Sequence, residues 1–346
     1  MGVMASLALY RKYRPARFAD VVGQEHITKV LEAEVKKGTL AHAYLFTGPR
    51  GTGKTSVARI LATAAGCEPY DLHEMDAASN RGIDDVRELR EAVRTLPFSS
   101  PVKVYIIDEV HMLTRESFNA LLKTLEEPPT HVIFILATTE LAKVPETIVS
   151  RCQTFVFKKP SPSLVAERVA RIAHDEGYTL EPEAGSLIAF LADGSFRDAE
   201  GILQKVLTVS QGKKVSADSA LEITGAPNRK LVRDYTMAIL GKDRALGLSA
   251  ISTARAGSVD MRIFARLVMR DLRMAMLIAV APEMKKTIAE DVGKEEFDYV
   301  TSLAGHERAR HLPEVLGALI EAYARMRYSA VPELPLELAL IELIGN

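Results

Sequence analysis

The stretch "AYLFTGPRGTGKTSVARILATAA" at 43–65 decides the fold class of this chain. A short apolar run ends in a glycine, and the residues from Gly48 onward, GPRGTGKT, fit the pattern G-x-x-x-x-G-K-[S/T]. A helix-forming sequence follows directly behind them. This order of strand, loop and helix is the context that a phosphate-binding loop requires, and it disfavours a chance glycine-rich turn.

The loop has the chemistry of a nucleotide site. Its glycines allow the backbone to curve so that N–H groups face phosphate oxygens, and the helix N-terminus adds positive potential. We expect Lys54 to reach the β- and γ-phosphates and Thr55 to ligate Mg²⁺. The predicted phosphate site consists of Gly48, Pro49, Arg50, Gly51, Thr52, Gly53, Lys54, Thr55 and Ser56.

An acidic pair follows a second apolar strand, "VYIIDE" at 104–109. In a parallel sheet this strand delivers Asp108 to the edge that carries the phosphate loop, where it would hold the magnesium shell. Glu109 is then placed to polarise the attacking water as general base. An ordinary strand that ends in acids is the alternative, and the upstream loop disfavours it. We interpret His111 as a solvent-facing or capping residue.

Strand-like segments recur through the first half of the chain. They lie at 43–48, 70–76, 102–109, 131–139 and 153–157. Helical patterns lie between them, and near-continuous apolar strands that alternate with helices indicate a parallel sheet covered on both faces. The sequence therefore predicts an α/β fold for this half.

The rest of the chain reads as helical. "KKPSPS" at 158–163 breaks the first pattern, with Ser163 as the expected helix N-cap, and only helical patterns appear from 163 to 222. "TGAPN" at 224–228 is a second break, after which helical patterns resume. We therefore expect an α/β nucleotide-binding domain at 1–158, a small helical domain at 159–223 and an all-helical domain at 224–346.

Composition narrows the class of protein. The chain has 346 residues, 47% of them hydrophobic and 26% charged, which is typical of a soluble globular protein with several domains. The formal net charge of −1 gives no overall basic field for nucleic acid. Two cysteines, Cys67 and Cys152, argue against a disulfide framework and fit a reducing cytoplasm. The sequence shows no secretory pattern at its start and no apolar run of membrane-spanning length.

Two further positions have more than one interpretation. Thr138 and Thr139 end a predicted strand on the phosphate side, where a hydroxyl orients water or senses the γ-phosphate, or simply caps the next turn. Arg197 follows Ser195, an expected N-cap, so it lies in a first helical turn where the helix dipole disfavours a cation. A nucleotide phosphate would reverse that preference; pairing with Asp198 or Glu200 is the alternative.

Arg151 stands directly before the predicted strand at 153–157. The preceding helix must return the chain to the opposite edge of the sheet, so Arg151 is poorly placed to reach its own phosphate loop. A surface salt bridge and an arginine finger supplied to a neighbouring subunit both fit this position. The periodicity of the sequence does not distinguish these two roles of Arg151.

Several long segments resemble one family. "LYRKYRPARFADVVGQEHI", "HAYLFTGPRGTGKTS", "DEVHMLTRESFNALLKTLEEPP" and "FILATTE", followed by "ETIVSRCQTF", closely resemble the bacterial clamp-loader ATPases of the DNA polymerase III gamma/tau type, which are AAA+ proteins. "GSFRDAEGIL" and "ELPLELALIEL" extend the resemblance over nearly the whole chain. It implies an AAA+ domain, a helical lid and an oligomerising collar. In this family a pentameric ring uses ATP and Mg²⁺ to open a sliding clamp and close it on primed DNA.

The resemblance also implies roles for individual residues. The Walker A and Walker B pairs are Lys54, Thr55, Asp108 and Glu109. The sensor and finger positions are Thr139 with Thr138 (sensor 1), Arg197 (sensor 2) and Arg151 (the finger acting in trans). The segments that enclose the adenine contribute Tyr10, Arg14, Pro15, Val22 and Gly23.

The sequence departs from the family in two respects. Family members usually carry four cysteines as a zinc module after the Walker A helix, whereas Cys67 stands alone in that region here. A structural zinc site needs about four ligands, so we expect no zinc. The longer family form also continues beyond the position of Asn346 into segments that bind helicase and polymerase. We interpret this sequence as either a natural short form or a truncated chain.

Contacts with DNA are the least determined feature. Arg81 and Gly82 precede a helix whose N-terminus suits a backbone phosphate, and Lys123 is a second candidate. A solvated surface cation is the alternative for either residue, and the family resemblance favours contact with DNA. Contacts of this kind would read duplex shape and phosphate position, and would not read base sequence.

Two other functions are compatible with the motifs. A Holliday-junction branch-migration motor shares the expected fold, but its third domain would resemble a winged helix with strands, and the tail here reads as helical. A non-catalytic structural subunit of the same ring would carry a degraded phosphate loop, and GPRGTGKT is intact.

Overall fold

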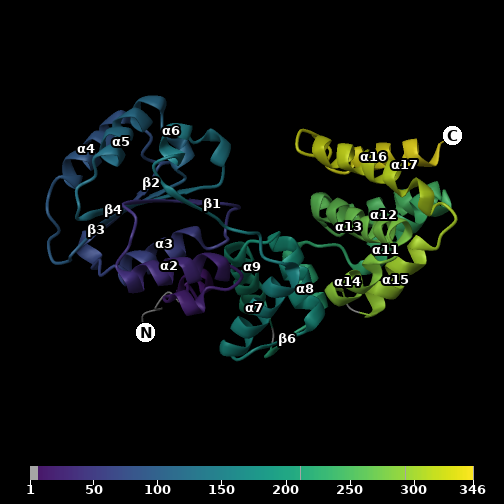
Figure 1. The fold of residues 1–346 in the computed structure, drawn as a ribbon. Coiled ribbons are helices and arrows are strands. Elements are labelled where there is room, and N and C mark those ends of the chain that lie inside the picture. The colour runs from purple at the N-terminus through teal and green to yellow at the C-terminus, as the bar shows by residue number, and fades with distance from the viewer. Residues whose placement is uncertain (1–6, 211, 293, 346) are drawn as a thin grey trace. The chain divides into compact units, whose positions relative to one another are not determined.

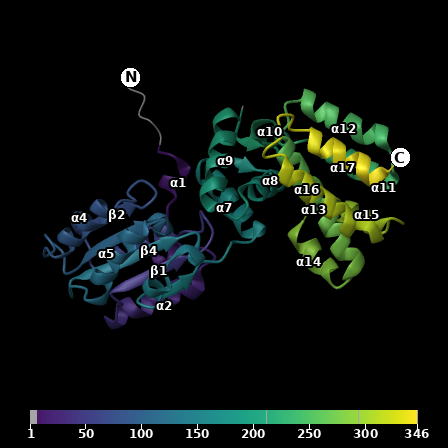
Figure 2. The same cartoon turned by 90° about the horizontal axis from the view of Figure 1, so that it is seen from above.

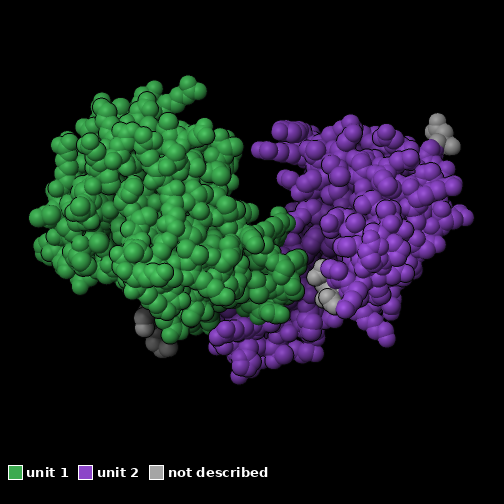
Figure 3. Space-filling view, viewed as in Figure 1, with its two compact units in different colours: residues 1–168, 192–201 green, residues 169–191, 202–346 purple. Residues whose placement is uncertain are grey.

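The computed structural model describes residues 7–210, 212–292 and 294–345. The chain divides into two compact units, coloured separately in Figure 3. Unit 1 consists of residues 1–168 and 192–201, and unit 2 of residues 169–191 and 202–346. No helix in the described part of the chain is long and apolar enough to cross a bilayer.

Unit 1 is built on a five-stranded parallel sheet with the order β2-β3-β4-β1-β5. The strands are β1 (Ala43–Thr47), β2 (Leu72–Asp76), β3 (Lys103–Asp108), β4 (Val132–Thr138) and β5 (Gln153–Val156). All five predicted strands are present, and the predicted α/β class is confirmed. Because every neighbouring pair is parallel, the loops that follow the strands gather at one edge, where ligands bind in sheets of this kind.

Helices cover both faces of this sheet (Figure 1; Figure 2). One face carries α2 (Glu25–Lys37) and α3 (Lys54–Ala64), and the other carries α4 (Ile83–Val93), α5 (Arg115–Glu126) and α6 (Glu146–Val149). The side chains of β1 alternate accordingly: Tyr44 and Phe46 pack with α2 and α3, whereas Ala43 and Leu45 pack with α4 and α5. Burial on both faces explains why β1, β3 and β4 read as nearly continuous apolar runs.

Helices α7 and α9 contribute to both units. They run over Pro162–Asp175 and Phe196–Val209, and a short helix, α1, covers Leu9–Lys12. The expected cap of α7 is wrong by two residues, because the Ser161 hydroxyl, and not that of Ser163, accepts the Leu164 N–H at 3.2 Å. Pro162 then occupies the first helical position, where its missing N–H costs nothing.

Unit 2 is largely helical. Its remaining helices are α8 (Pro182–Ala192), α10 (Ala217–Thr224), α11 (Arg229–Gly241), α12 (Arg244–Ala256), α13 (Met261–Val280), α14 (Met284–Asp291), α15 (Lys294–Ala304), α16 (Leu312–Arg325) and α17 (Leu334–Ile344). The expectation of helices alone between 163 and 222 is wrong in one detail. Two short strands, β6 (Thr179–Leu180) and β7 (Lys214–Val215), form a parallel pair. Strands of two residues are too short to produce a recognisable alternation in sequence.

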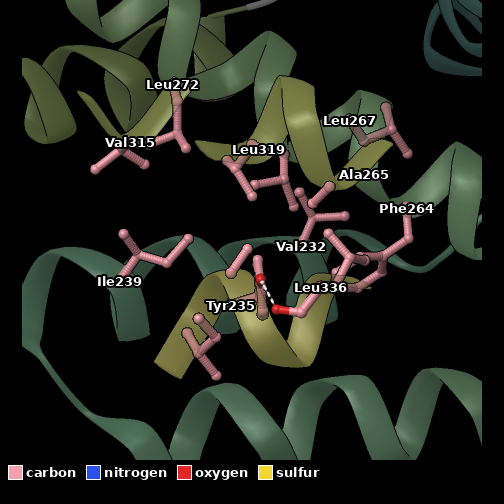
Figure 4. Close-up of a cluster of buried hydrophobic side chains, with 14 of the residues drawn as sticks. Val232, Tyr235, Ile239, Phe264, Ala265, Leu267, Leu272, Val315, Leu319 and Leu336 are labelled. Atoms are coloured by element: carbon pink, nitrogen blue, oxygen red, sulfur yellow. Dashed lines mark hydrogen bonds between the residues drawn. The ribbon is translucent and has the colours of Figure 1, made fainter. Parts of the chain in front are cut away.

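The core of unit 2 lies around α13 (Figure 4). Phe264, Leu267 and Leu272 on this helix are buried. The Tyr235 hydroxyl is fully buried beside them and donates to the Leu336 carbonyl at 2.9 Å. This bond fixes α11 against the start of α17.

Candidate nucleotide-binding site

Unit 1 contains a cavity of about 770 Å³ at the edge where β2 and β3 end. Most of the predicted nucleotide-site residues line it: Tyr10, Arg14, Pro15, Val22, Arg50, Gly51, Thr52, Gly53, Lys54, Thr55, Ser56, Asp108, Glu109 and Arg197. The remaining predicted site residues lie outside its lining: Gly23, Gly48, Pro49, Thr138, Thr139 and Arg151. A cavity of this size matches the range of small-molecule and cofactor sites.

Backbone conformation explains the glycines of the phosphate loop. Gly48, Gly51 and Gly53 have φ values of 143°, 73° and 101°, which side-chain-bearing residues rarely adopt. A Cβ on Gly51 would lie 1.9 Å from the Ser195 hydroxyl oxygen, so the loop also passes very close to the start of α9. The Phe196 N–H reinforces this approach by donating to the Gly51 carbonyl at 3.1 Å.

Lys54 is held inside the loop. Its ammonium donates to the Gly48 carbonyl at 2.7 Å and to the Pro49 carbonyl at 2.9 Å, and the residue is buried. Burial lowers the pKa of this ammonium, while Glu109 and Asp108 oppose that effect. The positive charge is thus fixed beside the loop before any phosphate binds.

Thr55, in the phosphate loop that follows β1, lies beside Asp108 at the end of β3, as the sequence predicts. The Thr55 hydroxyl donates to Asp108 Oδ2 at 2.8 Å, and the Glu109 N–H donates to Asp108 Oδ1 at 2.9 Å. A threonine hydroxyl and a carboxylate are hard oxygen ligands of the type that Mg²⁺ prefers. The two side chains therefore fit the magnesium ion that the motif implies.

Glu109 adopts a left-handed backbone conformation, with φ 48° and ψ 43°. Its side chain lines the cavity, and its Oε2 atom accepts a hydrogen bond from the Thr139 hydroxyl at 2.9 Å. Thr139 thus reaches the site through Glu109, although it does not line the cavity itself. A strained backbone at a residue with this placement is typical of functional sites.

Of the two alternatives expected for His111, the solvent-facing one is wrong. Its side chain is only 5% exposed, and its Nδ1 lies 3.0 Å from the hydroxyl oxygen of Thr138, which is fully buried. The expectation failed because residues 110–112 form a short 3₁₀ helix that turns the imidazole back toward β4. The sequence pattern of a polar residue after a strand carries no signal for this turn.

The start of α9 places Arg197 at the cavity. The Ser195 hydroxyl accepts the Asp198 N–H at 3.2 Å, which confirms the predicted N-cap. The Arg197 guanidinium lies over the Tyr10 ring, 5.0 Å from its centroid. Glu200 is paired with a different cation, Arg168, at 3.2 Å.

Seven charged residues that line the cavity were not predicted as site residues: Arg11, Asp20, Arg59, Glu74, Asp76, Arg168 and Glu200. Arg59 and Glu74 form an ion pair at 2.5 Å, and Arg59 lies one helical turn after Thr55 on α3, a spacing that could have revealed it. Burial raises the pKa of Glu200 to about 6, against the opposing effect of Arg168. A pair formed between α7 and α9 leaves no local pattern.

Arg151 lies away from this cavity. Its guanidinium forms an ion pair with Glu126 at 2.7 Å and donates to the Thr147 carbonyl at 2.8 Å. It precedes β5, whose first residue pairs with Tyr44 near the start of β1, whereas the phosphate loop follows the end of β1. The side chain is 35% exposed and therefore remains accessible from outside.

The candidate DNA-contacting residues lie on the surface near α4 and α5. The Gly82 N–H already donates to Asp85 Oδ2 at 3.0 Å, so the start of α4 is capped by its own carboxylate. Arg81 donates through Nε to the Ala78 carbonyl at 2.8 Å, and Lys123 is exposed on α5. A phosphate at Gly82 would have to displace Asp85.

A phosphate loop after β1, an acidic pair after β3 and a helical continuation define the class as a P-loop ATPase fold of the AAA+ type. A solved structure of the Thermotoga maritima RuvB Holliday junction branch migration motor has this fold, with a TM-score of 0.53 and 23% identity over 68% of this chain and 85% of that chain. A family described as "DNA polymerase III, delta subunit" matches residues 23–81 and 70–161.

Curated relatives identify the family more closely. The tau subunit of DNA polymerase III from Bacillus subtilis is 37% identical over 98% of this chain, and the gamma/tau subunit from Mycobacterium tuberculosis is 36% identical over 98%. The Escherichia coli tau subunit is 40% identical over 73%. The chain is homologous to the bacterial DNA polymerase III gamma/tau subunits over nearly its whole length, which confirms the resemblance noted in the sequence. It spans 63%, 62% and 43% of the lengths of these three relatives.

Proposed function

We propose that this chain is an ATP-binding and ATP-hydrolysing motor subunit of a bacterial clamp loader, part of the DNA polymerase III holoenzyme, which loads a sliding clamp onto primed DNA. The observation that carries the proposal is the 2.8 Å contact between Thr55 and Asp108 beside a buried Lys54. It brings the phosphate loop and the acidic pair together at one cavity, in a chain homologous to clamp-loader subunits.

ATP binding is assigned to the phosphate loop. Lys54 exchanges the carbonyls of Gly48 and Pro49 for β- and γ-phosphate oxygens, and the loop N–H groups bind the remaining oxygens. Thr55 and Asp108 hold Mg²⁺, which neutralises charge on the phosphates when it is bound. The base is enclosed by Tyr10, Arg14, Pro15, Val22 and Gly23, and Arg197 contacts phosphate from α9.

Hydrolysis is assigned to Glu109. Its carboxylate takes a proton from a water molecule as the water oxygen forms a bond to the γ-phosphorus, and the bond from that phosphorus to the oxygen of ADP breaks. Thr139 holds one carboxylate oxygen, which leaves the other free to meet the water. Thr138, buried behind Thr139, supports this end of β4.

Arg151 acts on the neighbouring subunit. Its position at the opposite end of the sheet from the phosphate loop and its partial exposure both support a finger that reaches an ATP bound to the next subunit in a ring. Release from Glu126 would free the guanidinium for the γ-phosphate. Arginine fingers in GTPases are worth about 10³–10⁵ in rate.

The trans role of Arg151 is tested by mixing subunits. Arg151→Ala should leave ATP binding by its own subunit intact and abolish ATP hydrolysis in the adjacent subunit. A mixture with Lys54→Ala subunits restores some interfaces with an intact lysine and an intact finger, so activity should return once co-assembly is shown. A mixture that stays inactive after co-assembly would exclude the trans role.

The partners follow from the same proposal: the other subunits of a pentameric ring, the sliding clamp and primer-template DNA. The AAA+ domain (1–158) and the lid (159–223) bind nucleotide, and the collar (224–346) oligomerises. Arg81, Gly82 and Lys123 are the proposed phosphate contacts on DNA. Contacts of this kind would read duplex shape and phosphate position, because phosphate contacts carry no base-sequence information.

The RuvB likeness shows the fold and raises branch migration as a second candidate. From 217 to 345 the described residues form helices and connecting loops, with no strand of the kind that a winged helix requires. This observation favours a clamp loader. The intact phosphate loop likewise favours a catalytic over a purely structural subunit.

Two variants test the proposed activity. Lys54→Ala removes the charge that faces the triphosphate, and titration with a fluorescent ATP analogue should show nearly complete loss of binding. Glu109→Gln should bind the analogue normally and hydrolyse ATP very slowly in a single-turnover assay. Wild-type affinity in the first variant or near-normal turnover in the second would remove these residues from their proposed roles.

A further inference from the structure

His111 is a buried imidazole between the end of β3 and the end of β4. It lies two residues after Glu109, and its side chain is 5% exposed. His111 is not one of the proposed nucleotide-binding residues, and it has no role in the proposed hydrolytic step. A buried titratable side chain this close to the proposed general base needs a physical explanation.

The polar groups around His111 connect it to both strand ends. Nδ1 lies 3.0 Å from the Thr138 hydroxyl oxygen and 3.4 Å from Glu109 Oε2, while Nε2 lies 3.4 Å from Glu140 Oε1. The Thr138 oxygen also accepts the Glu140 N–H at 3.0 Å. The imidazole therefore lies between the carboxylate of Glu109 and two polar side chains, that of Thr138 at the end of β4 and that of Glu140 just after it.

The same oxygen of Glu109 has two neighbours. Oε2 accepts the Thr139 hydroxyl at 2.9 Å and faces the imidazole, so both groups hold one side of the carboxylate. The other oxygen remains available on a side chain that lines the cavity. A general base works only when one of its oxygens stays within hydrogen-bond reach of the proton that it removes.

The backbone of Glu109 makes this support necessary. Its left-handed conformation is strained for a residue that carries a side chain, so surrounding contacts must define it. Thr139 alone leaves the carboxylate free to rotate about its hydrogen bond. A second group on the same oxygen restricts that rotation, and His111 supplies this group.

We propose that His111 is a positioning residue, which holds Glu109 in its productive orientation by tying it to Thr138 at the end of β4 and to Glu140 two residues beyond it. The inference rests on the proposed function, in which Glu109 is the general base. It predicts an effect on the hydrolytic step and none on ATP binding, because His111 does not line the cavity.

The variants separate positioning from packing. The amide nitrogen of His111→Asn takes roughly the place of Nδ1, whereas that of His111→Gln falls near Nε2, and His111→Ala provides neither. We expect His111→Ala to lower kcat about 10- to 100-fold, with KM and ATP affinity changed less than about 2-fold. His111→Asn should recover most of the lost kcat and His111→Gln little of it.

His131 offers a matched control. It is a partly buried histidine whose Nε2 contacts the backbone carbonyls of Val93 and Thr95, just before β4 begins and far along the strand from Thr138. His131→Asn should leave kcat unchanged. Thermal unfolding of all variants shows whether loss of kcat simply follows loss of stability.

The decisive experiment is a double-mutant cycle with Glu109→Gln in the full chain assembled with its partner subunits. If His111 acts through Glu109, adding His111→Ala to Glu109→Gln should change the residual rate less than about 2-fold. An equal loss in both backgrounds, a loss of ATP affinity, or kcat that follows stability regardless of the substituent would overturn the inference. Should His111→Ala fail to fold, the order of His111→Asn above His111→Gln decides instead.

The same data distinguish this inference from the proposed function. Absence of ATP binding and hydrolysis in the wild-type assembly would remove the proposed function, whereas normal hydrolysis by Glu109→Gln would remove Glu109 as the general base and the inference about His111 with it. Inactive Glu109→Gln together with fully active His111→Ala would overturn the role of His111 alone.

Discussion

Gly51→Ala tests the close approach between the phosphate loop and α9. Gly51 has a φ of 73°, and an added Cβ would lie 1.9 Å from the Ser195 Oγ atom and 2.7 Å from its Cβ. Ser195 is the N-cap of α9, so it cannot move without weakening the helix that carries Arg197. The substitution therefore has two costs in the folded protein.

The two costs add to a measurable loss of stability. An alanine in left-handed backbone costs about 1 kcal/mol, and displacement of an N-cap serine costs about 1 kcal/mol more. We expect Gly51→Ala to lower the free energy of unfolding by about 2–3 kcal/mol. Gly53→Ala is the matched control, because its φ is 101° but its Cβ would meet nothing within 4 Å. It should lose only about 1 kcal/mol.

Urea unfolding without nucleotide measures both variants. A second substitution, Ser195→Gly, removes the clashing atoms and costs only a few tenths of a kcal/mol at an N-cap, so it should restore much of the stability lost in Gly51→Ala. Equal losses in Gly51→Ala and Gly53→Ala would show that contact with Ser195 does not destabilise Gly51→Ala. A Gly51→Ala/Ser195→Gly variant no more stable than Gly51→Ala would show the same.

Two more predictions concern buried polar groups. Burial raises the pKa of Glu200 to about 6 from an ordinary 4.5, so the folded state favours its protonated form. The free energy of unfolding should therefore fall as the pH rises from about 4.5 to 6. Glu200→Gln should reduce this fall and, in urea unfolding above pH 6, be more stable than the wild type by up to about 2 kcal/mol. The same pH dependence of unfolding free energy in both proteins would contradict this. Tyr235→Phe leaves the Leu336 carbonyl without its buried donor and should cost about 1–2 kcal/mol, whereas Tyr323→Phe, which loses only a 3.3 Å contact from Arg262 at the surface, should cost less than about 0.5 kcal/mol. Equal costs in the two tyrosine variants would argue against the Tyr235 bond.

The sequence predicts the sheet and the phosphate site well because both depend on local patterns. Apolar runs buried on both faces mark β1, β3 and β4, and GPRGTGKT specifies a loop whose glycines adopt positive φ. Asp108 and Glu109 follow directly from the end of β3. The N-cap at Ser195 is equally local, since a serine three residues before an acid is a helix-start signal.

Features that depend on tertiary contacts could not be predicted from the sequence. His111 is buried because a 3₁₀ turn directs it toward β4, and no periodic pattern encodes that turn. Arg168 and Glu200 meet only when α7 and α9 pack together. The paired strands β6 and β7 are separated by more than 30 residues and have two residues each, which is below the length that alternation can reveal.

The measurement that bears most directly on the proposed function is steady-state ATP hydrolysis by this chain, assembled with its partner subunits, with and without sliding clamp and primed DNA. If the chain is a clamp-loader motor, clamp and primer-template together should raise kcat several-fold. The same assembly built with Lys54→Ala should show no hydrolysis at this subunit. Hydrolysis that ignores clamp and primed DNA, or that responds instead to a four-way junction, would contradict the assignment as a clamp-loader motor.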